Sequence, residues 1–285
     1  MTTRADALNA SVPPDRLYYA TGELLDAADF RAEQLYHRGR LARALAYLHG
    51  SGTVAGLRIP PVEPADAEAE ERLLVEPGLA IDPLGRLIEV PRAQCIRLDR
   101  WYRAEPADRL RQARQSVTVA GNPVTGVVVD VYIRFVQCER GKTPSFAAGP
   151  FDALDAVSPS RLRDGFELSL LARIENPPPE PVSPWPDLAA LAPEDRAVAA
   201  REAVLDAWRG GTESLAPGEV PEPLAEHAQA LGQDSGSVFL ARLVLPADPA
   251  PEADARPVRI LDAPVVVNEL RPLVYPGGLL GRLLG

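Results

Sequence analysis

The spacing of hydrophobic positions changes along the chain, and the first clear pattern is helical. Residues 26–49 repeat apolar side chains at the α-helical period, with Asp26 or Asp29 as the N-cap and Gly50 as the stop. At about 100° per residue, one face of this helix gathers seven mostly apolar side chains. They are Phe30, Gln34, His37, Leu41, Ala44, Leu45 and Leu48. The pattern predicts an amphipathic helix whose apolar face is covered by protein, either its own body or a neighbouring subunit.

Beyond Gly52 the period changes to two. Residues 53–59 alternate as a half-buried strand does. Further short strands are predicted at 73–76, 79–82, 86–90 and 95–98. Turn-forming residues, among them Pro77-Gly78 and Asp82-Pro83-Leu84-Gly85, separate them. Short strands with frequent turns favour a β-sandwich or a barrel.

Three longer apolar runs, at 127–136, 166–174 and 238–245, predict the central strands of a covered sheet. Strand-like residues return at 257–267. Two acidic residues, Asp130 and Glu167, interrupt the apolar runs. Alternation predicts that their side chains face solvent, and a catalytic role in a cleft is the alternative.

Helical insertions are predicted near 99–116, where Pro106 interrupts the pattern, and within 176–235, with a helix at 194–208. The predicted fold class is α+β and mainly β, a sandwich- or barrel-like core preceded by a long N-terminal helix. From the N-terminus, the predicted parts are an arm and docking helix at 1–52, a β-rich body at 53–270, and an apolar tail at 271–285. Residues 1–25 lack helical periodicity, so an extended arm anchored by Tyr18 and Tyr19 is expected.

Composition places this sequence among soluble globular proteins. The 285 residues are 46% hydrophobic and 25% charged, and 40 acidic against 30 basic side chains give a net charge of −10. This acidity argues against nucleic acid as a partner, because phosphate binding needs clustered Lys and Arg. No apolar stretch approaches the roughly 20 residues of a membrane helix. The N-terminus lacks the apolar region of a secretory signal, so a cytoplasmic location is expected, within an assembled particle.

The two cysteines, Cys95 and Cys138, are too few for a disulfide framework or a zinc site. Both lie in apolar runs, so buried free thiols are predicted. A Cys95–Cys138 disulfide is the alternative if two strands place them side by side.

Motifs for common enzyme chemistry are missing from the sequence, including phosphate-binding loops, dinucleotide fingerprints and metalloprotease helices. Three histidines are too few for a multi-histidine metal site. A hydrolase built on His49, Ser51 and Asp82 is the best catalytic alternative. A helix C-cap explains His49-Gly50 more simply. No catalytic, cofactor-binding or metal-binding residues are therefore predicted, and no cofactor.

A second alternative is a glycan- or surface-ligand-binding module of the sandwich type. Its aromatic side chains would stack against sugar rings. The candidates are Trp101, Tyr102, Trp185 and Trp208. Two of them fall in predicted helices, where packing in the core is the commoner role.

Three segments carry a resemblance to a known group of proteins. They are residues 16–25 (Arg-Leu-Tyr-Tyr-Ala-Thr-Gly-Glu-Leu-Leu), 48–57 (Leu-His-Gly-Ser-Gly-Thr-Val-Ala-Gly-Leu) and 75–86 (Val-Glu-Pro-Gly-Leu-Ala-Ile-Asp-Pro-Leu-Gly-Arg). They resemble bacterial proteins encoded with phage-tail-like contractile injection systems and with phage baseplate or tail-fibre genes. The resemblance covers residues 13–100, is weaker from 138 to 168, and is absent from 176–235.

The resemblance implies a non-enzymatic structural or adaptor subunit, associated with the baseplate or fibre of a tail-like assembly. Its expected partners are other subunits of that assembly, and a homo-oligomer is also compatible with the pattern. The expected docking residues lie in the arm and on the helix. They are Tyr18, Tyr19, Phe30, Gln34, Tyr36, His37, Leu41 and Leu45.

Overall fold

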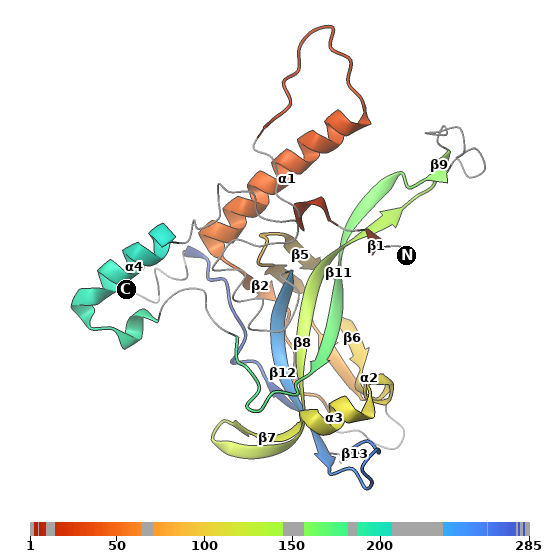
Figure 1. The fold of residues 1–285 in the computed structure, drawn as a ribbon, viewed down its shortest axis with the longest axis vertical. Helices are drawn as coiled ribbons and strands as arrows, with labels where there is room; N and C mark the ends of the chain where they lie inside the picture. The colour runs from red at the N-terminus through yellow and green to blue at the C-terminus, as the bar shows by residue number, and fades with distance from the viewer. Residues whose placement is uncertain are drawn as a thin grey trace.

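The computed structural model describes residues 3–4, 6–9, 15–63, 71–144, 157–181, 187–206, 236–260 and 262–277, with residues 279 and 282. In this part of the chain the fold is α+β and mainly β, as predicted. A long N-terminal helix lies beside a β-rich body (Figure 1).

One long strand organises the largest sheet. β8 pairs along one edge with β7 and β11, and along its other edge with β12 and β1. β12 in turn pairs with β13 and β14, and every pairing is antiparallel. The strands of this sheet are β1 (Thr3–Arg4), β7 (Arg114–Val119), β8 (Asn122–Arg140), β11 (Arg161–Ala172), β12 (Ser237–Asp248), β13 (Val258–Arg259) and β14 (Val265–Val267). The three long apolar runs therefore form β8, β11 and β12, which confirms their prediction as central strands.

The short strands form two smaller sheets. β2 (Gly52–Gly56), β4 (Gly78–Ile81) and β5 (Leu87–Val90) lie in one, and β3 (Arg72–Val75) pairs with β6 (Gln94–Arg97) in the other. The first strand ends at Gly56 instead of the predicted Ile59. Gly56 and Leu57 both have positive φ, so the chain leaves the extended conformation there. The Leu57 N–H, beyond the end of β2, donates to the Pro77 carbonyl at 3.0 Å.

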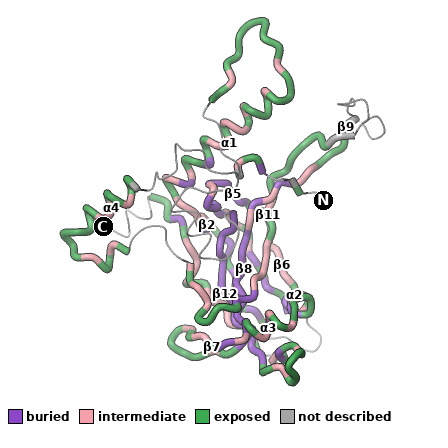
Figure 2. Tube along the Cα trace, viewed as in Figure 1, coloured by how far each residue is buried: buried purple, intermediate pink, exposed green. Residues whose placement is uncertain are grey.

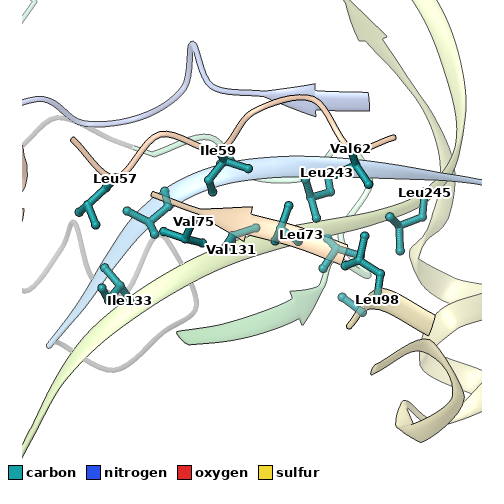
Figure 3. Close-up of a cluster of buried hydrophobic side chains, with 14 of the residues drawn as sticks. Leu57, Ile59, Val62, Leu73, Val75, Leu98, Val131, Ile133, Leu243 and Leu245 are labelled. Carbon is teal, nitrogen blue, oxygen red and sulfur yellow. The ribbon is translucent and has the colours of Figure 1, made fainter. Parts of the chain in front are cut away.

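The main hydrophobic core lies between the large sheet and these smaller sheets. Figure 3 shows side chains from the segment after β2 and from β3 meeting those of β8 and β12. The labelled residues are Leu57, Ile59, Val62, Leu73, Val75, Leu98, Val131, Ile133, Leu243 and Leu245. Each is buried, and burying one such side chain contributes about 1.5–3 kcal/mol. This layered core is the origin of the fold's stability.

The opposite face of β8 is also covered, which corrects one prediction. Asp130 does not face solvent: its carboxylate is fully buried and accepts hydrogen bonds from Arg173 and Arg242. Covering both faces of the sheet removes the solvent-facing side that alternation assumes. Glu167 is exposed as predicted and pairs with Arg134 at 2.6 Å.

The helical insertions also follow the sequence. α2 (Leu98–Ala104) and α3 (Ala107–Ala113) are separated at Pro106. α4 (Pro193–Asp206) lies in the second insertion after a short 3₁₀ turn, η2 (Leu188–Ala190), while 182–186 and 207–235 lie outside the described residues. None of the described helices combines the length and apolar character that crossing a membrane requires.

One extension of the sheet leaves the body. β8 and β11 stay paired up to Arg140 and Arg161, and β9 (Thr143–Pro144) and β10 (Val157–Ser158) pair beyond them. The resulting ribbon projects away from the body of the fold (Figure 1).

Segments near both termini join the body. Thr3 pairs with Cys138 of β8, and a 3₁₀ turn, η1 (Ala7–Asn9), follows. Near the other end, Leu273 bridges to Thr53 of β2 and Val274 is buried. Of the predicted apolar tail, residues 278, 280, 281 and 283–285 lie outside the described residues.

The prediction of two buried thiols is wrong for Cys95. Both cysteines are free, but Cys95 is exposed and Cys138 is half-buried. Cys95 pairs with Leu74 on the outer side of the β3–β6 sheet, where alternate residues point away from the core. An apolar run in a two-stranded sheet thus does not guarantee burial.

Candidate interaction surface

The N-terminal helix has a well-defined start and end. α1 (Ala27–His49) begins at Asp26, which settles the choice between the two predicted N-caps. Asp26 Oδ1 accepts from the Ala28 N–H at 2.6 Å, and Asp29 Oδ2 accepts from the Asp26 N–H at 2.8 Å. This reciprocal capping box satisfies donors that the first turn leaves free. At the other end Gly50, with φ of +73°, donates to the Ala46 carbonyl.

One side of α1 packs on the body through small residues. Ala42 and Ala46 are buried, and the turn between β4 and β5 lies directly against Ala42. A Cβ added to Gly85 of that turn would lie 1.8 Å from the Ala42 carbonyl oxygen. Alanines on the helix and glycine on the turn allow the two backbones to touch.

Charged groups fasten the same side of α1. Asp6, which is buried, accepts from the Arg38 guanidinium of α1 at 3.1 Å and lies 3.5 Å from Arg86 Nη1. The Arg86 side chain also donates to Asp82 at 2.6 Å and lies over the Phe135 ring. This cluster of Asp6, Arg38, Asp82 and Arg86, called the pin below, joins the N-terminal arm, the helix and the β4–β5 turn.

Burial changes the pKa of one residue of the pin, Asp82. Loss of hydration raises the pKa of Asp82 to about 6, although Arg86 and two backbone N–H groups favour the charged form. Both Asp82 oxygens accept hydrogen bonds, Oδ1 from the Leu84 and Arg86 N–H groups and Oδ2 from Arg86 Nε.

The rest of the helix surface faces outward (Figure 2). Among the predicted docking residues, Tyr18, Tyr19, Phe30, Gln34, His37 and Leu41 are exposed, and Tyr36 and Leu45 are half-buried. The exposed fractions are 81% for Tyr18, 52% for Phe30 and 63% for Leu41, and Leu48 reaches 77%. The side of the helix that the body covers is therefore a different one from the predicted apolar face.

Local contacts order part of this outer surface. The Tyr36 ring meets His37 edge-on at 5.3 Å, and the Arg40 guanidinium lies over Tyr36 at the same distance. His37 Nε2 lies 3.7 Å from the Glu33 carboxylate, one turn away. These contacts hold the side chains along the helix and leave their outer sides open to a partner. The segment 15–26 before the helix loops away from the body (Figure 1).

The hydrolase candidates do not form a catalytic arrangement. His49 is exposed, Ser51 is half-buried, and Asp82 is fully buried with its carboxylate committed to the pin. In the described part of the chain, no hydrogen bond joins His49 to Ser51 or to Asp82. A triad requires the acid to orient the imidazole and the imidazole to contact the hydroxyl.

The glycan-binding alternative also finds little support in the geometry. The Tyr102 ring is buried and its hydroxyl donates to the Pro257 carbonyl at 2.8 Å, while Trp101 packs against the core. Trp185 and Trp208 lie outside the described residues. Within the described ranges, no group of three His, Cys, Asp or Glu side chains is arranged to hold a metal ion.

Sequence reasoning missed the pin and the buried pairing of Asp130. Asp6 and Arg38 are 32 residues apart and Asp6 and Arg86 are 80 apart, so no local spacing connects them. One signal was available: Asp82 and Arg86 flank a predicted turn, at a separation that allows them to pair. Arginines inside the apolar runs, Arg173 in 166–174 and Arg242 in 238–245, were a second signal.

Comparison of the chain with protein-family models finds no match, and a search of curated proteins finds none either. Its function is therefore inferred from its residues and their arrangement.

Proposed function

We propose that this chain is a non-enzymatic structural or adaptor subunit of a phage-tail-like contractile assembly, associated with its baseplate or fibres. The observation that carries the proposal is the outer surface of α1. The helix is capped at both ends and fastened to the body, yet it exposes Phe30, Leu41 and Leu48. Exposed apolar residues grouped along one rigid element are typical of a protein-interaction site.

The shape of the fold supports the same proposal. The segment before α1 and the β8–β11 ribbon both extend away from the body (Figure 1). Projecting elements of this kind reach neighbours in an assembly, where stable contacts bury about 800 Å² per partner. The resemblance of residues 13–100 includes the arm, α1 and the turn that supports it, which are the elements that form this surface.

Incorporation into particles tests the proposal. We expect the wild-type chain, coexpressed with the products of its neighbouring genes, to co-sediment with the assembled particle. The variant Leu41→Glu, Leu48→Glu should reduce incorporation at least about tenfold, because charges replace the apolar contacts. Incorporation of this variant at the wild-type level would contradict the proposal.

A matched control uses exposed apolar residues of another helix. Val198→Glu, Leu205→Glu changes α4, whose two side chains are as exposed as Leu41. This variant should be incorporated like the wild type. Circular dichroism and thermal unfolding of both variants check that the fold is kept.

A further inference from the structure

One face of the β8–β11 ribbon carries three arginines close together. Arg140 and Arg161 lie directly opposite each other in the register, and Arg163 follows two residues along β11. Residues two apart in a strand lie on the same face, about 7 Å apart, and directly opposed Cβ atoms lie about 5 Å apart. All three residues are exposed. We call these three arginines the basic face.

The charge of the basic face is not balanced within the described part of the fold. Closer to the body, Arg134 on the same face pairs with Glu167 at 2.6 Å. No described carboxylate forms such a pair with the three arginines of the basic face. Glu139 and Asp164 alternate with them along the strands and therefore lie on the opposite face, where Asp164 accepts from Gln137. Like charges directly opposite each other destabilise a strand pair, so a negatively charged partner would remove this cost.

The same end of β11 has a free backbone edge. β11 pairs with β8 along one edge, and in the described ranges no strand pairs with its other edge. Residues 161–164 are all exposed, and the ribbon there lies away from the body (Figure 1). In an antiparallel pair, alternate residues direct their N–H and C=O groups away from the partner strand. Such groups at a sheet edge can pair with one more strand.

The edge and the basic face together select an acidic strand. A strand added beside β11 would place its side chains at cross-strand distance from Arg161 and Arg163. Carboxylates at every second residue of that strand would lie on the side of the basic face, at the same spacing of about 7 Å as the two arginines. Opposite charges across two strands stabilise their pairing, and a guanidinium group binds a carboxylate through two parallel hydrogen bonds.

Other occupants lack one of these two requirements. Nucleic acid and anionic lipid carry negative charge, but they have no peptide groups to pair with the edge. The net charge of −10 on the chain also repels such extended arrays of negative charge. A second copy of this chain does offer a strand, but pairing residues 161–164 with the same residues of that copy would set arginine against arginine. Like charges of this kind select against a pairing.

We propose that residues 161–164, at the end of the ribbon, bind an extended acidic segment of a partner protein. The segment adds a strand to the free edge of β11 and places alternate carboxylates on Arg161 and Arg163. This site is separate from the α1 surface and goes beyond the proposed function.

Binding of a labelled peptide to the purified full-length chain tests the charge recognition. The probe is an eight-residue peptide in which glutamate alternates with threonine, and fluorescence anisotropy measures its dissociation constant. Arg161→Glu, Arg163→Glu should raise this constant at least about tenfold, because repulsion replaces two attractive pairs. No binding to the wild type would overturn the proposal.

A matched control separates the basic face from the net charge. Arg58→Glu, Arg92→Glu alters two exposed arginines elsewhere in the fold and changes the net charge by the same amount. The dissociation constant of this variant should stay within about twofold of the wild-type value, since surface charges far from the site are screened by salt. Equal losses in the two variants would show that the ribbon is not the site.

Backbone methylation distinguishes strand addition from charge attraction alone. Methyl groups on the backbone nitrogens of either the glutamates or the threonines keep the charge of the peptide and block hydrogen bonds along one of its edges. One of these two peptides should bind at least about tenfold more weakly, and the other should bind like the parent. Unchanged binding by both peptides would overturn the added strand. Equally tight binding of a single-stranded DNA octamer would do the same.

A charge swap keeps the test independent of the variant's stability. A peptide in which lysine replaces glutamate should bind Arg161→Glu, Arg163→Glu more tightly than it binds the wild type. Failure of this rescue, in a variant whose circular dichroism matches the wild type, would contradict recognition by opposite charge. Because all these measurements use the purified chain, a negative result leaves the structural role of the α1 surface intact.

Discussion

At the scale of single residues, burial has changed the chemistry of one carboxylate. Asp82 is fully enclosed and is held by Arg86 and by two backbone N–H groups. Hydrogen bonds favour its charged form, but loss of hydration outweighs them and raises its pKa to about 6. The folded chain therefore binds a proton at Asp82 more tightly than the unfolded chain does.

The stability contribution of Asp82 should consequently depend on pH. Its pKa is higher in the folded state than the ordinary 3.8, so lowering the pH from 7.5 to 5 favours folding at this site. Compared with Asp82→Asn, the wild type should gain roughly 1 kcal/mol over this interval. Urea unfolding of both proteins at the two pH values measures the difference. The quantity compared is the free energy of unfolding of the wild type minus that of Asp82→Asn. A value that is the same at both pH values, or lower at pH 5, would refute the raised pKa.

At the scale of elements, the contact of α1 with the β4–β5 turn depends on the absence of a side chain. Gly85 has a φ of +81°, and an added Cβ would lie 1.8 Å from the Ala42 carbonyl oxygen. Neither backbone can move without separating the helix from the turn. Gly121, in the turn before β8, has nearly the same φ of +82° but nothing within 4 Å of the added atom.

These two glycines separate conformational strain from steric overlap. Gly121→Ala should cost only the strain of positive φ, about 1 kcal/mol. Gly85→Ala should cost that amount and the displacement of α1, at least about 3 kcal/mol in total. The free energies of unfolding from chemical denaturation test this. If both variants lose the same free energy of unfolding, the contact between Gly85 and Ala42 does not add a steric cost.

At the scale of the whole molecule, a buried network ties the proline-rich segment after β11 to the large sheet. Asp130 accepts from Arg173 Nε at 2.5 Å and from Arg242 Nε at 2.7 Å. Arg242 also donates to the carbonyls of Pro178 and Pro179. Arg173 donates to the Tyr132 hydroxyl at 2.7 Å. The Asp130 carboxylate thus balances the charge of two buried guanidinium groups. Through Arg242 it also fixes the start of the insertion at 176–235.

Removing that carboxylate should be severe. Asp130→Ala leaves two buried arginines without their main counter-charge, and we expect a loss of at least about 3 kcal/mol in unfolding free energy. Glu167→Ala is the matched control. It breaks another arginine–carboxylate pair of β8 and β11, one that is largely exposed, and should cost less than about 1 kcal/mol. Similar losses in the two variants would mean that burial adds nothing to the Asp130 network.

The sequence by itself determined the elements. The caps of α1, the break at Pro106, the short strands and the three long apolar runs depend on neighbouring residues, and each element forms near its predicted place. The bounds differ: β2 ends at Gly56, and β8 extends from Asn122 to Arg140, beyond the predicted 127–136. The second covered face of the large sheet was beyond sequence reasoning, because it depends on segments that return from far along the chain. For this reason Asp130 was expected in solvent. Cys95 was expected in the core because its apolar run does not show which side of the β3–β6 sheet faces outward.

Only the tertiary structure decided which side of α1 the body covers. Periodicity shows that the helix has an apolar face, but the body covers the side of the small residues Ala42 and Ala46, and the Gly85 backbone fits closely against Ala42. The pin added charges from residues 6, 38, 82 and 86, whose proximity arises only on folding. Small side chains and a buried ion cluster fastened one side of the helix, and its larger apolar residues were left facing outward.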